Sequence, residues 1–209
     1  MSSAPRTRLC LVTDRGLARG RTLLDIVAAA VAGGATMVQV REKDLPTRAF
    51  IEEARALKAL LAPRGVPLIV NDRADVALAV DADGLHVGQD DMPYATARAM
   101  LGPGKIIGLS ITHLDQLAEA DARAADYLGI GPIFAQATKA DAAPPLGLDG
   151  LRAAQERTSR PLMAIGGIDA GNAGDVIAAG AHGLAIVSAI VAADDPRAAT
   201  MAIAAAFRG

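Results

Sequence analysis

The sequence has few aromatic side chains, with 2 Tyr, 3 Phe and no Trp among 209 residues, although 52% of its residues are hydrophobic. A chain of this length can bury one sizeable core. Small side chains must fill most of that core, because 47 residues are Ala and 21 are Gly. Small side chains let neighbouring backbones approach closely, as they do where helices pack on a sheet. The composition therefore favours an α/β architecture over an aromatic-rich sandwich.

Cysteine and long apolar runs are also scarce. The single Cys10 excludes an internal disulfide, and the apolar residues around it indicate a buried strand rather than a reactive thiol. No apolar run reaches the length of a membrane span, and residues 1–8 lack the apolar stretch of a secretory signal. We therefore expect a cytoplasmic protein with no membrane partner.

Charge of neither sign is in excess. The chain has 21 basic and 23 acidic residues, which gives a formal net charge of −2. This balance produces no field that would attract nucleic acid or an anionic membrane, so we predict neither as a partner. Basic residues that matter for function must act locally.

The sequence does contain eight short apolar runs, each followed by a turn and an alanine-rich helical stretch, which is the alternation typical of a parallel α/β sheet. The predicted strands are Leu9–Thr13, Met37–Val40, Leu68–Val70, Gly84–Val87, Ile106–Leu109, Tyr127–Ile130, Leu162–Ile165 and Leu184–Val187. Eight βα units in about 200 residues predict a small (β/α)8 TIM barrel, with its active site at the C-terminal ends of the strands. No linker interrupts the chain, so we expect a single barrel domain over residues 1–209.

A doubly wound open sheet is the alternative fold. Residues 12–16 lack the Gly-rich fingerprint that usually follows the first strand of such a sheet. The junction from helix into strand also repeats, in residues 32–38, 82–87 and 179–185, where glycine admits the turn into an apolar strand. This repetition indicates one structural unit used several times, as a barrel requires.

Gln39, Arg41 and Lys43 alternate along the end of the second predicted strand, so an extended chain would point all three toward one side. One amide and two cations would then form an anion clamp at the barrel mouth. The alternative is a solvated loop in which Glu42 is the counter-ion. The lysines favour the clamp: the chain has 17 Arg but only four Lys, and Lys43 and Lys139 both fall in predicted strand-to-helix loops, where a flexible ammonium suits a phosphate.

Carboxylates follow the next two predicted strands. Asn71 and Asp72 come after the third strand, and Asp90 and Asp91 come after the fourth. Because neighbouring strand ends of a barrel face one cavity, a carboxylate pair near a polyphosphate would suit magnesium. The alternative is helix capping, in which one member of each pair caps the helix that follows.

The remaining strand ends carry hydroxyls and glycines. Ser110 ends the fifth strand, and the loop of residues 132–146 after the sixth is long enough to indicate a lid. Gly167 follows the seventh strand, and Val187 and Ser188 end the eighth. Backbone N–H groups beside a hydroxyl at this position are typical of the phosphate site of such barrels.

With these residues in this order, the sequence resembles the thiamine-phosphate synthase family over nearly its whole length. The matching motifs are Gln39-Val40-Arg41-Glu42-Lys43, Asn71-Asp72, His86-Val87-Gly88-Gln89-Asp90-Asp91, Gly108-Leu109-Ser110, Gly131-Pro132-Ile133-Phe134, Thr138-Lys139 and Ala164-Ile165-Gly166-Gly167-Ile168. Members of this family are small (β/α)8 barrels that join a pyrimidine carrying a diphosphooxymethyl group to a thiazole ethyl phosphate, which gives thiamine phosphate and pyrophosphate. The resemblance implies that pyrophosphate departs with the assistance of magnesium before the thiazole nitrogen attacks, so no protein nucleophile is needed.

The resemblance also implies roles for individual residues. The pyrimidine and its diphosphate would be held by Gln39, Arg41, Lys43, Asn71, Ser110 and Lys139. Of these, the catalytic residues would be Arg41, Lys43, Ser110 and Lys139. The thiazole phosphate would be held by Gln136, Thr138, Gly167, Val187 and Ser188. The cofactor Mg²⁺ would be bound by Asp72 and Asp91, and Gln136 stands where family members usually have Thr.

Two other functions stay open at this point. The first is that of the thiazole tautomerases, a related subgroup whose barrel is similar and which use a histidine near the position of His113. The second is that of a non-catalytic protein, which would only bind a phosphorylated ligand. The predicted diphosphate clamp favours the synthase, because tautomerisation needs no such clamp. We expect His113 on a surface helix, His86 in a packing role and His182 in a turn. The sequence leaves open whether the barrel forms a homodimer.

Overall fold

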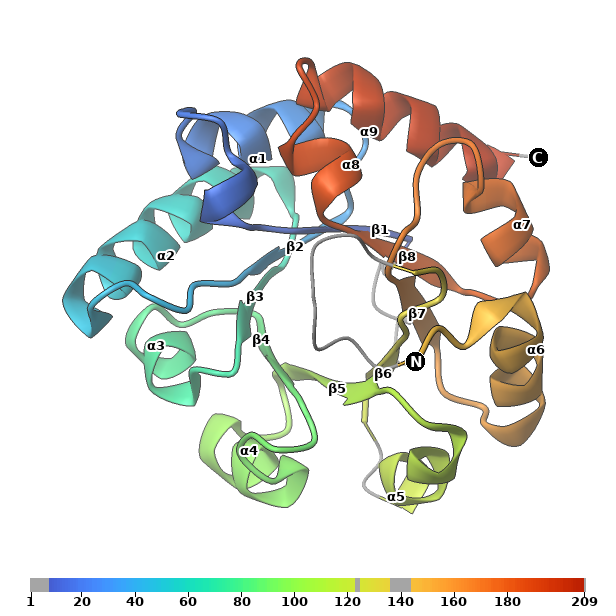
Figure 1. Cartoon of the computed structure of the whole chain (residues 1–209). Helices are drawn as coiled ribbons and strands as arrows, with labels where there is room; N and C mark the ends of the chain where they lie inside the picture. Colours follow the sequence, from blue (N-terminus) through green and yellow to red (C-terminus); the bar gives the residue numbers. More distant parts are fainter. Residues whose placement is uncertain (1–7, 123–124, 136–143, 209) are drawn as a thin grey trace.

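Parallel strands close into a barrel in the computed structural model, which describes residues 8–122, 125–135 and 144–208 (Figure 1). Neighbouring strands follow the chain order from β1 to β8, and β8 pairs with β1 to complete the ring. The strands are β1 Leu9–Val12, β2 Met37–Val40, β3 Leu68–Asn71, β4 Gly84–Val87, β5 Ile106–Ile111, β6 Tyr127–Ile130, β7 Leu162–Ile165 and β8 Gly183–Ile186. The predicted (β/α)8 fold is confirmed.

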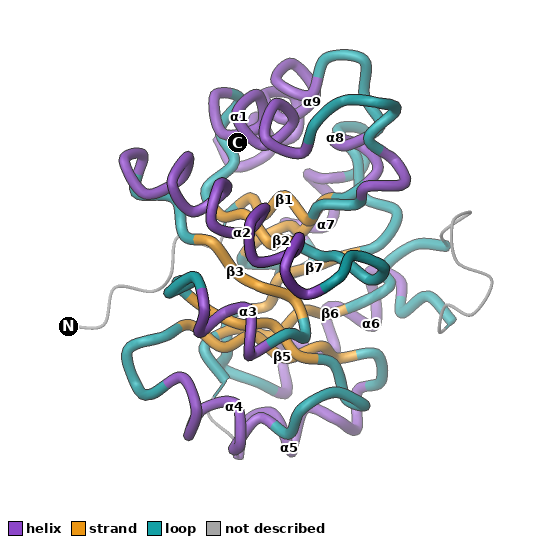
Figure 2. Tube along the Cα trace, turned by 90° about the vertical axis from the view of Figure 1, so that its left-hand side faces the viewer, coloured by secondary structure: helices purple, strands orange, loops and turns teal. Residues whose placement is uncertain are grey.

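Helices cover the outside of the barrel, as Figures 1 and 2 show from two directions. The α-helices are α1 Leu23–Ala32, α2 Thr47–Leu61, α3 Ala74–Ala79, α4 Tyr94–Leu101, α5 Leu117–Ala122, α6 Gly147–Arg157, α7 Ala173–Ala178, α8 Ser188–Val191 and α9 Pro196–Ala204. Short 3-10 helices are η1 Arg15–Leu17, η2 Ala62–Arg64, η3 Leu114–Gln116 and η4 Ala205–Arg208. In the described ranges, none of the helices combines the length and the apolar character that a membrane crossing needs.

The predicted strand positions agree closely with the observed ones. Met37–Val40, Gly84–Val87, Tyr127–Ile130 and Leu162–Ile165 have the predicted bounds. The other strands differ by one or two residues at an end, and β5 differs most. It continues to Ile111 rather than Leu109, because Ile111 still pairs with Ile130 of β6.

The barrel wall separates two apolar layers. Outward-facing side chains such as Leu11, Val38 and Leu85 join the core that packs against the helices. The interior holds Cys10, Val12, Met37, Ile69, Tyr127, Met163 and Ala185. Cys10 is fully buried, and burial raises the pKa of its thiol to about 12, so it is the inert strand residue that the sequence predicts.

One side chain just before each even-numbered strand ties the barrel together at the end opposite its mouth. These residues are Thr36, Asp83, Asp126 and His182, which precede β2, β4, β6 and β8. Each accepts a hydrogen bond from a backbone N–H at the start of the preceding odd-numbered strand. The donor–acceptor pairs are Leu9 N–H to Thr36 (3.0 Å), Leu68 N–H to Asp83 (2.8 Å), Ile107 N–H to Asp126 (2.7 Å) and Leu162 N–H to His182 (3.2 Å). Three of the four lie in the helix-to-strand junctions that repeat in the sequence. The repeat therefore has a physical role, which is to pair N–H groups at the strand starts.

The two carboxylates of this set also bind the helix that leads into the odd-numbered strand. Asp83 accepts from Lys58 Nζ of α2 at 2.6 Å, and Asp126 accepts from Arg98 Nη2 of α4 at 2.7 Å. Arg98 donates further to the carbonyls of Gly102 and Lys105. Each carboxylate thus joins a strand to its helix through one residue.

We expect Asp126→Ala to lower the free energy of unfolding by about 1–3 kcal/mol, because it leaves the Ile107 N–H and the Arg98 guanidinium without their shared acceptor. Urea denaturation followed by circular dichroism measures the change. Asp149→Ala is the matched control, since it removes only the exposed partner of Arg152 and should cost less than about 0.5 kcal/mol. Equal effects of the two substitutions would contradict this role of Asp126.

Candidate active site

A cavity of about 830 Å³ opens at the C-terminal ends of the strands. Because side chains alternate along a strand, every second residue of the barrel wall points inward, and the last inward-facing positions line this cavity. The predicted site residues that line it are Gln39, Arg41, Asn71, Ser110, Gly167, Val187 and Ser188. The closed barrel therefore brings together residues from β2, β3, β5 and the segments after β7 and β8.

Other predicted site residues are not among the described residues that line the cavity. Lys43 is exposed on the segment between β2 and α2 and is absent from the cavity lining of the described residues. Gln136, Thr138 and Lys139 lie outside the described residues, as does most of the expected lid at 132–146.

Arg41 is held at the cavity by its backbone. Its N–H donates to Oγ1 of Thr13 at 3.0 Å, and Thr13 is fully buried after β1. Gln39, two residues earlier, is also buried and lies within β2. The end of β1 therefore sets where the chain carrying Arg41 leaves the barrel.

Asp91 lies close enough to Asp72 to raise the pKa of its carboxyl. The pKa of Asp72 is raised to about 6, first by burial and then by a hydrogen bond and the negative charge of Asp91, while the positive charge of Arg41 acts in the opposite direction. The backbone of Asp72 is left-handed, with φ at 60°, and its N–H donates to the His86 carbonyl at 2.8 Å. Two carboxylates that repel each other beside a cavity are a donor set that suits a hard divalent cation.

Helix capping does not account for these carboxylates. The N-cap residue of α3 is Arg73 and that of α4 is Pro93, and neither helix has a side-chain hydrogen bond at its cap. Asp91 instead accepts from the Gly88 N–H at 2.8 Å, within the loop after β4. The capping alternative is therefore wrong, because the loops place the acidic side chains before the helices begin.

His86 does more than pack, which corrects the expectation from the sequence. Its side chain is buried on β4 and lines the cavity. Its Nδ1 lies 2.9 Å from the Tyr127 hydroxyl, and its Nε2 lies 2.9 Å from Ser110 Oγ. Burial lowers the pKa of His86 to about 4, so the imidazole is neutral near pH 7 and has one donor and one acceptor nitrogen. His86 therefore links the cavity hydroxyl of Ser110 to the barrel interior.

Tyr127 extends this buried network to Gln39. Burial raises the pKa of the Tyr127 phenol well above its usual value, and a hydrogen bond with the Gln39 side chain opposes that shift. A phenol with a raised pKa stays protonated, so it can donate to His86 Nδ1. The network of Gln39, Tyr127, His86 and Ser110 is thus uncharged and fixes two cavity-lining polar groups from behind.

Two glycines make room for this network. A Cβ on Gly108 would collide with the Tyr127 ring and with Nδ1 of His86, and a Cβ on Gly129 would lie 2.9 Å from Cε1 of His86. His86 pairs with Gly108 across the β4–β5 ladder. A glycine opposite a histidine on the next strand is the sequence signal that could have identified His86 as a site residue.

The loop after β7 bends sharply at the cavity. Gly167 has a left-handed φ of 66°, and a Cβ there would lie 2.7 Å from Cβ of Phe134. Val187 is the N-cap residue of α8, and Ser188 is its first residue. Both segments therefore place backbone beside the cavity, as the sequence-predicted phosphate site requires.

The remaining histidines lie away from the cavity lining of the described residues. His113 is exposed and is the N-cap residue of η3, where it forms a capping box with Gln116, rather than a residue within a surface helix. His182 accepts the Leu162 N–H in the junction before β8, as expected for a turn residue. Proton transfer by His113, which a tautomerase would need, has no geometric support.

Comparison with known proteins gives one consistent family. A family profile described as Thiamine monophosphate synthase matches residues 9–190. A thiamine-phosphate synthase of Chloroflexus aurantiacus is 59% identical over 192 residues, covering 92% of this chain and 88% of that protein. One from Vibrio campbellii is 55% identical over 195 residues, covering 92% and 94%. The solved thiamine phosphate pyrophosphorylase of Pyrococcus furiosus superposes with a TM-score of 0.90 at 39% identity, over 98% of this chain and 97% of that one.

The buried state of His86 predicts a pH dependence of stability. Its pKa is about 4 when folded and about 6.5 when unfolded, so between these values the unfolded chain binds the extra proton. The contribution of His86 to stability is therefore present above pH 6.5 or so and is lost as the pH falls toward about 4. We expect the stability difference between the unchanged protein and His86→Gln to shrink steadily over this range in urea denaturation. A difference independent of pH would contradict a neutral buried His86.

Proposed function

This chain belongs to the thiamine monophosphate synthase family and joins a pyrimidine diphosphate to a thiazole phosphate, and we propose that its barrel mouth acts mainly on the departing pyrophosphate. In this reaction the bond between the pyrimidine methylene carbon and the bridging oxygen breaks, and the electron pair leaves with pyrophosphate. The lone pair of the thiazole nitrogen then forms the new carbon–nitrogen bond. The enzyme must therefore stabilise negative charge on one group while it holds two substrates in line.

The observation that supports this proposal most is the proximity of Arg41, which lines the cavity, to Asp72 and through it to Asp91, although neither carboxylate is among the described lining residues. The positive charge of Arg41 is near enough to lower the pKa of Asp72 against the effect of burial. A guanidinium is a permanent cation that can bind two phosphate oxygens at once. Arg41, with Lys43 and Lys139 from the flanking loops, would bind the diphosphate and take up the charge that develops on it.

Asp72 and Asp91 would hold Mg²⁺. Burial first, and Asp91 second, raises the pKa of Asp72, and a divalent cation would relieve both the burial of its charge and the repulsion by Asp91. No cluster of three or more potential metal-binding side chains occurs in the described part of the chain, so diphosphate oxygens and water would complete the coordination shell. When bound, the ion supplies positive charge next to the leaving group.

Polar side chains would orient the pyrimidine. Gln39, Asn71 and Ser110 line the cavity, and the network behind Gln39 and Ser110 holds both in place. Because His86 is neutral, Nε2 as a donor to Ser110 Oγ leaves the serine proton free to point toward the substrate. Orientation by hydrogen bonds suits a cavity whose described lining has Tyr127 and His86 as its aromatic rings.

The segments after β7 and β8 would hold the thiazole phosphate. Gly167 and Ser188 line the same cavity from the side opposite the carboxylate pair along the strand order. Their backbone N–H groups and the Ser188 hydroxyl are suitable phosphate donors, and Gln136 and Thr138 would add side chains. This arrangement would place the thiazole across the cavity from the pyrophosphate that it displaces.

The direct test is the condensation itself. Incubation of the protein with the pyrimidine diphosphate, the thiazole phosphate and Mg²⁺ should give equal amounts of thiamine phosphate and pyrophosphate. The products are separated by liquid chromatography. Binding of both substrates without any product would instead favour a non-catalytic protein and would contradict the proposal.

We expect Arg41→Ala to lower kcat by about 10²- to 10³-fold, because it removes a charge that acts on the leaving group. Initial rates at saturating concentrations of both substrates measure the effect. Arg64→Ala is the control, since Arg64 is exposed on η2 and binds only the nearby Leu60 carbonyl among the described contacts. Unchanged turnover in Arg41→Ala would remove Arg41 from the diphosphate site.

We expect Asp72→Asn to raise the Mg²⁺ concentration needed for half-maximal rate, by about tenfold or more, because a neutral amide is a weaker ligand for a hard cation. A titration of initial rate against Mg²⁺ measures the shift. Asp75→Asn, an exposed carboxylate that pairs with Arg73 in the same region, should leave the titration unchanged. If both variants behave alike, Asp72 does not bind the metal.

A further inference from the structure

The segment that carries Arg41 and Lys43 has little regular structure of its own. It runs from the end of β2 to the N-cap of α2 at Pro46. Outside the strands and helices, no backbone–backbone hydrogen bond of the described residues involves residues 41–45. Its position must therefore depend on side chains, and one of its anchors is the bond from the Arg41 N–H to Thr13.

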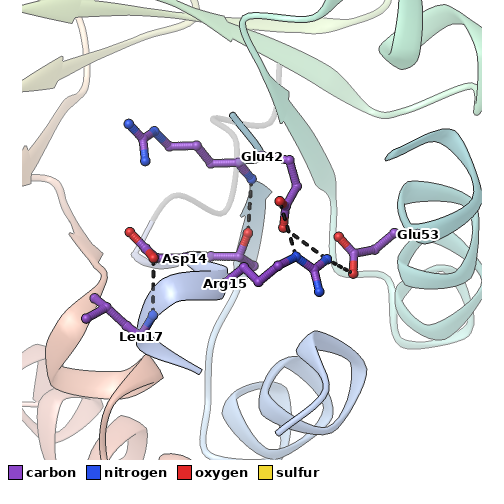
Figure 3. Close-up of polar contacts among 7 residues, drawn as sticks. Asp14, Arg15, Leu17, Glu42 and Glu53 are labelled. Atoms are coloured by element: carbon purple, nitrogen blue, oxygen red, sulfur yellow. Dashed lines mark hydrogen bonds and ion pairs between the residues drawn. The ribbon is translucent and has the colours of Figure 1, made fainter. Parts of the chain in front are cut away.

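The second anchor is an ion cluster made by Arg15, Glu42 and Glu53 (Figure 3). Arg15 Nε donates to Glu42 Oε2 at 3.3 Å, and Arg15 Nη2 lies 3.2 Å from Glu42 Oε1 and 2.5 Å from Glu53 Oε1. Arg15 belongs to η1 after β1, and Glu53 belongs to α2. The guanidinium thus joins three parts of the chain: the β1 connection, the segment after β2 and the helix that follows it.

This cluster depends on its single cation. The Glu42 side chain is only 5% exposed, and burial together with the nearby Glu53 raises its pKa, while Arg15 opposes that shift. Glu42 Oε1 and Glu53 Oε2 are buried without a hydrogen bond in the described structure. If Arg15 were removed, two partly buried carboxylates would face each other without a counter-ion, so the segment would move to separate them.

The cluster faces away from the cavity. Asp14, Gly16 and Leu17 line the cavity, whereas Arg15 and Glu42 do not. In an extended chain the side chain of Glu42 points to the side opposite those of its neighbours Arg41 and Lys43. Glu42, between two predicted diphosphate ligands, is therefore bound to the scaffold, while its neighbour Arg41 lines the cavity.

We propose that Arg15 is a positioning residue for the diphosphate: it holds Glu42 against α2 and so sets the place of Arg41 and Lys43. This inference rests on the proposed function, because it assigns the diphosphate to these two cations. Arg15 does not touch the substrate. Its effect is to hold the segment in the binding geometry before the substrate arrives.

The test has two readouts. Calorimetry measures the affinity for pyrophosphate in the presence of Mg²⁺, and steady-state kinetics measures the KM for each substrate. We expect Arg15→Ala to weaken pyrophosphate binding and to raise the KM of the pyrimidine diphosphate by about tenfold each, with the KM of the thiazole phosphate unchanged. Arg152→Ala is the control, since it breaks an exposed ion pair on α6 and should change none of these values.

A second variant separates positioning from simple electrostatics. Glu42→Ala removes a negative charge next to Arg41 and Lys43, so long-range electrostatics alone would strengthen pyrophosphate binding. Loss of the anchor would weaken it instead. We expect weaker binding, and a double variant of Arg15→Ala and Glu42→Ala no weaker than the worse single one, because both break the same contact.

The outcomes distinguish this inference from the function on which it rests. If the unchanged protein neither binds pyrophosphate nor forms thiamine phosphate, the proposed function fails and the inference fails with it. If it does both, and Arg15→Ala binds pyrophosphate normally or Glu42→Ala binds it more tightly, only the inference is overturned. Circular dichroism checks folding. Should Arg15→Ala not fold, Arg15→Gln replaces it, because the neutral amide leaves the two carboxylates without a counter-ion, and wild-type affinity in that variant would also overturn the inference.

Discussion

The closure of β8 onto β1 is the constraint on which the site depends. Parallel ladders join each strand to the next one in the chain, so the C-terminal ends of all the strands meet around one opening. Residues as far apart in the sequence as Gln39 and Ser188 line one cavity for this reason alone. The side chains at the other end, such as Asp83 and Asp126, pair the N–H groups at the strand starts and fix the strands to their helices. A rigid wall then allows loops to carry the charged groups without moving the cavity.

Few aromatic rings lie inside the described barrel, and small residues lie beside the two that belong to the buried polar network. Tyr127 and His86 occupy the centre, and Gly108 and Gly129 on the strands beside them leave the space that these rings need. A barrel interior of mostly aliphatic and sulfur-containing side chains can therefore hold a buried polar network, because these two glycines leave room for it. Because both rings are uncharged near pH 7, the charged side chains in the described cavity lining are Asp14 and Arg41, and Arg41 lies close to Asp72. The near-neutral total charge of the chain does not reveal this local concentration of charge.

The sequence predicted the barrel and most strand bounds, because strands buried on both faces read as apolar runs. Seven of the proposed site residues line the cavity, because they lie near or just after the end of such a run. The sequence did not predict the roles of His86 and Arg15. The sequence shows which residues alternate along one strand, but the partners of His86 lie on β5 and β6, and those of Arg15 lie on α2 and on the segment after β2. The alternative that one member of each acidic pair caps the next helix is wrong for a related reason: the N-cap residues are Arg73 and Pro93, and Asp91 accepts from the Gly88 N–H within its own loop. Local pattern predicts elements well, and contacts between elements require the closed fold.

A crystal structure of the protein with pyrophosphate and Mg²⁺ would show whether the barrel mouth is built around the departing diphosphate. We expect pyrophosphate oxygens within hydrogen-bond distance of the Arg41 guanidinium and a metal ion bound by Asp72 and Asp91, with oxygen ligands at about 2.1 Å. Pyrophosphate bound elsewhere in the barrel, with both carboxylates free of metal, would contradict this expectation.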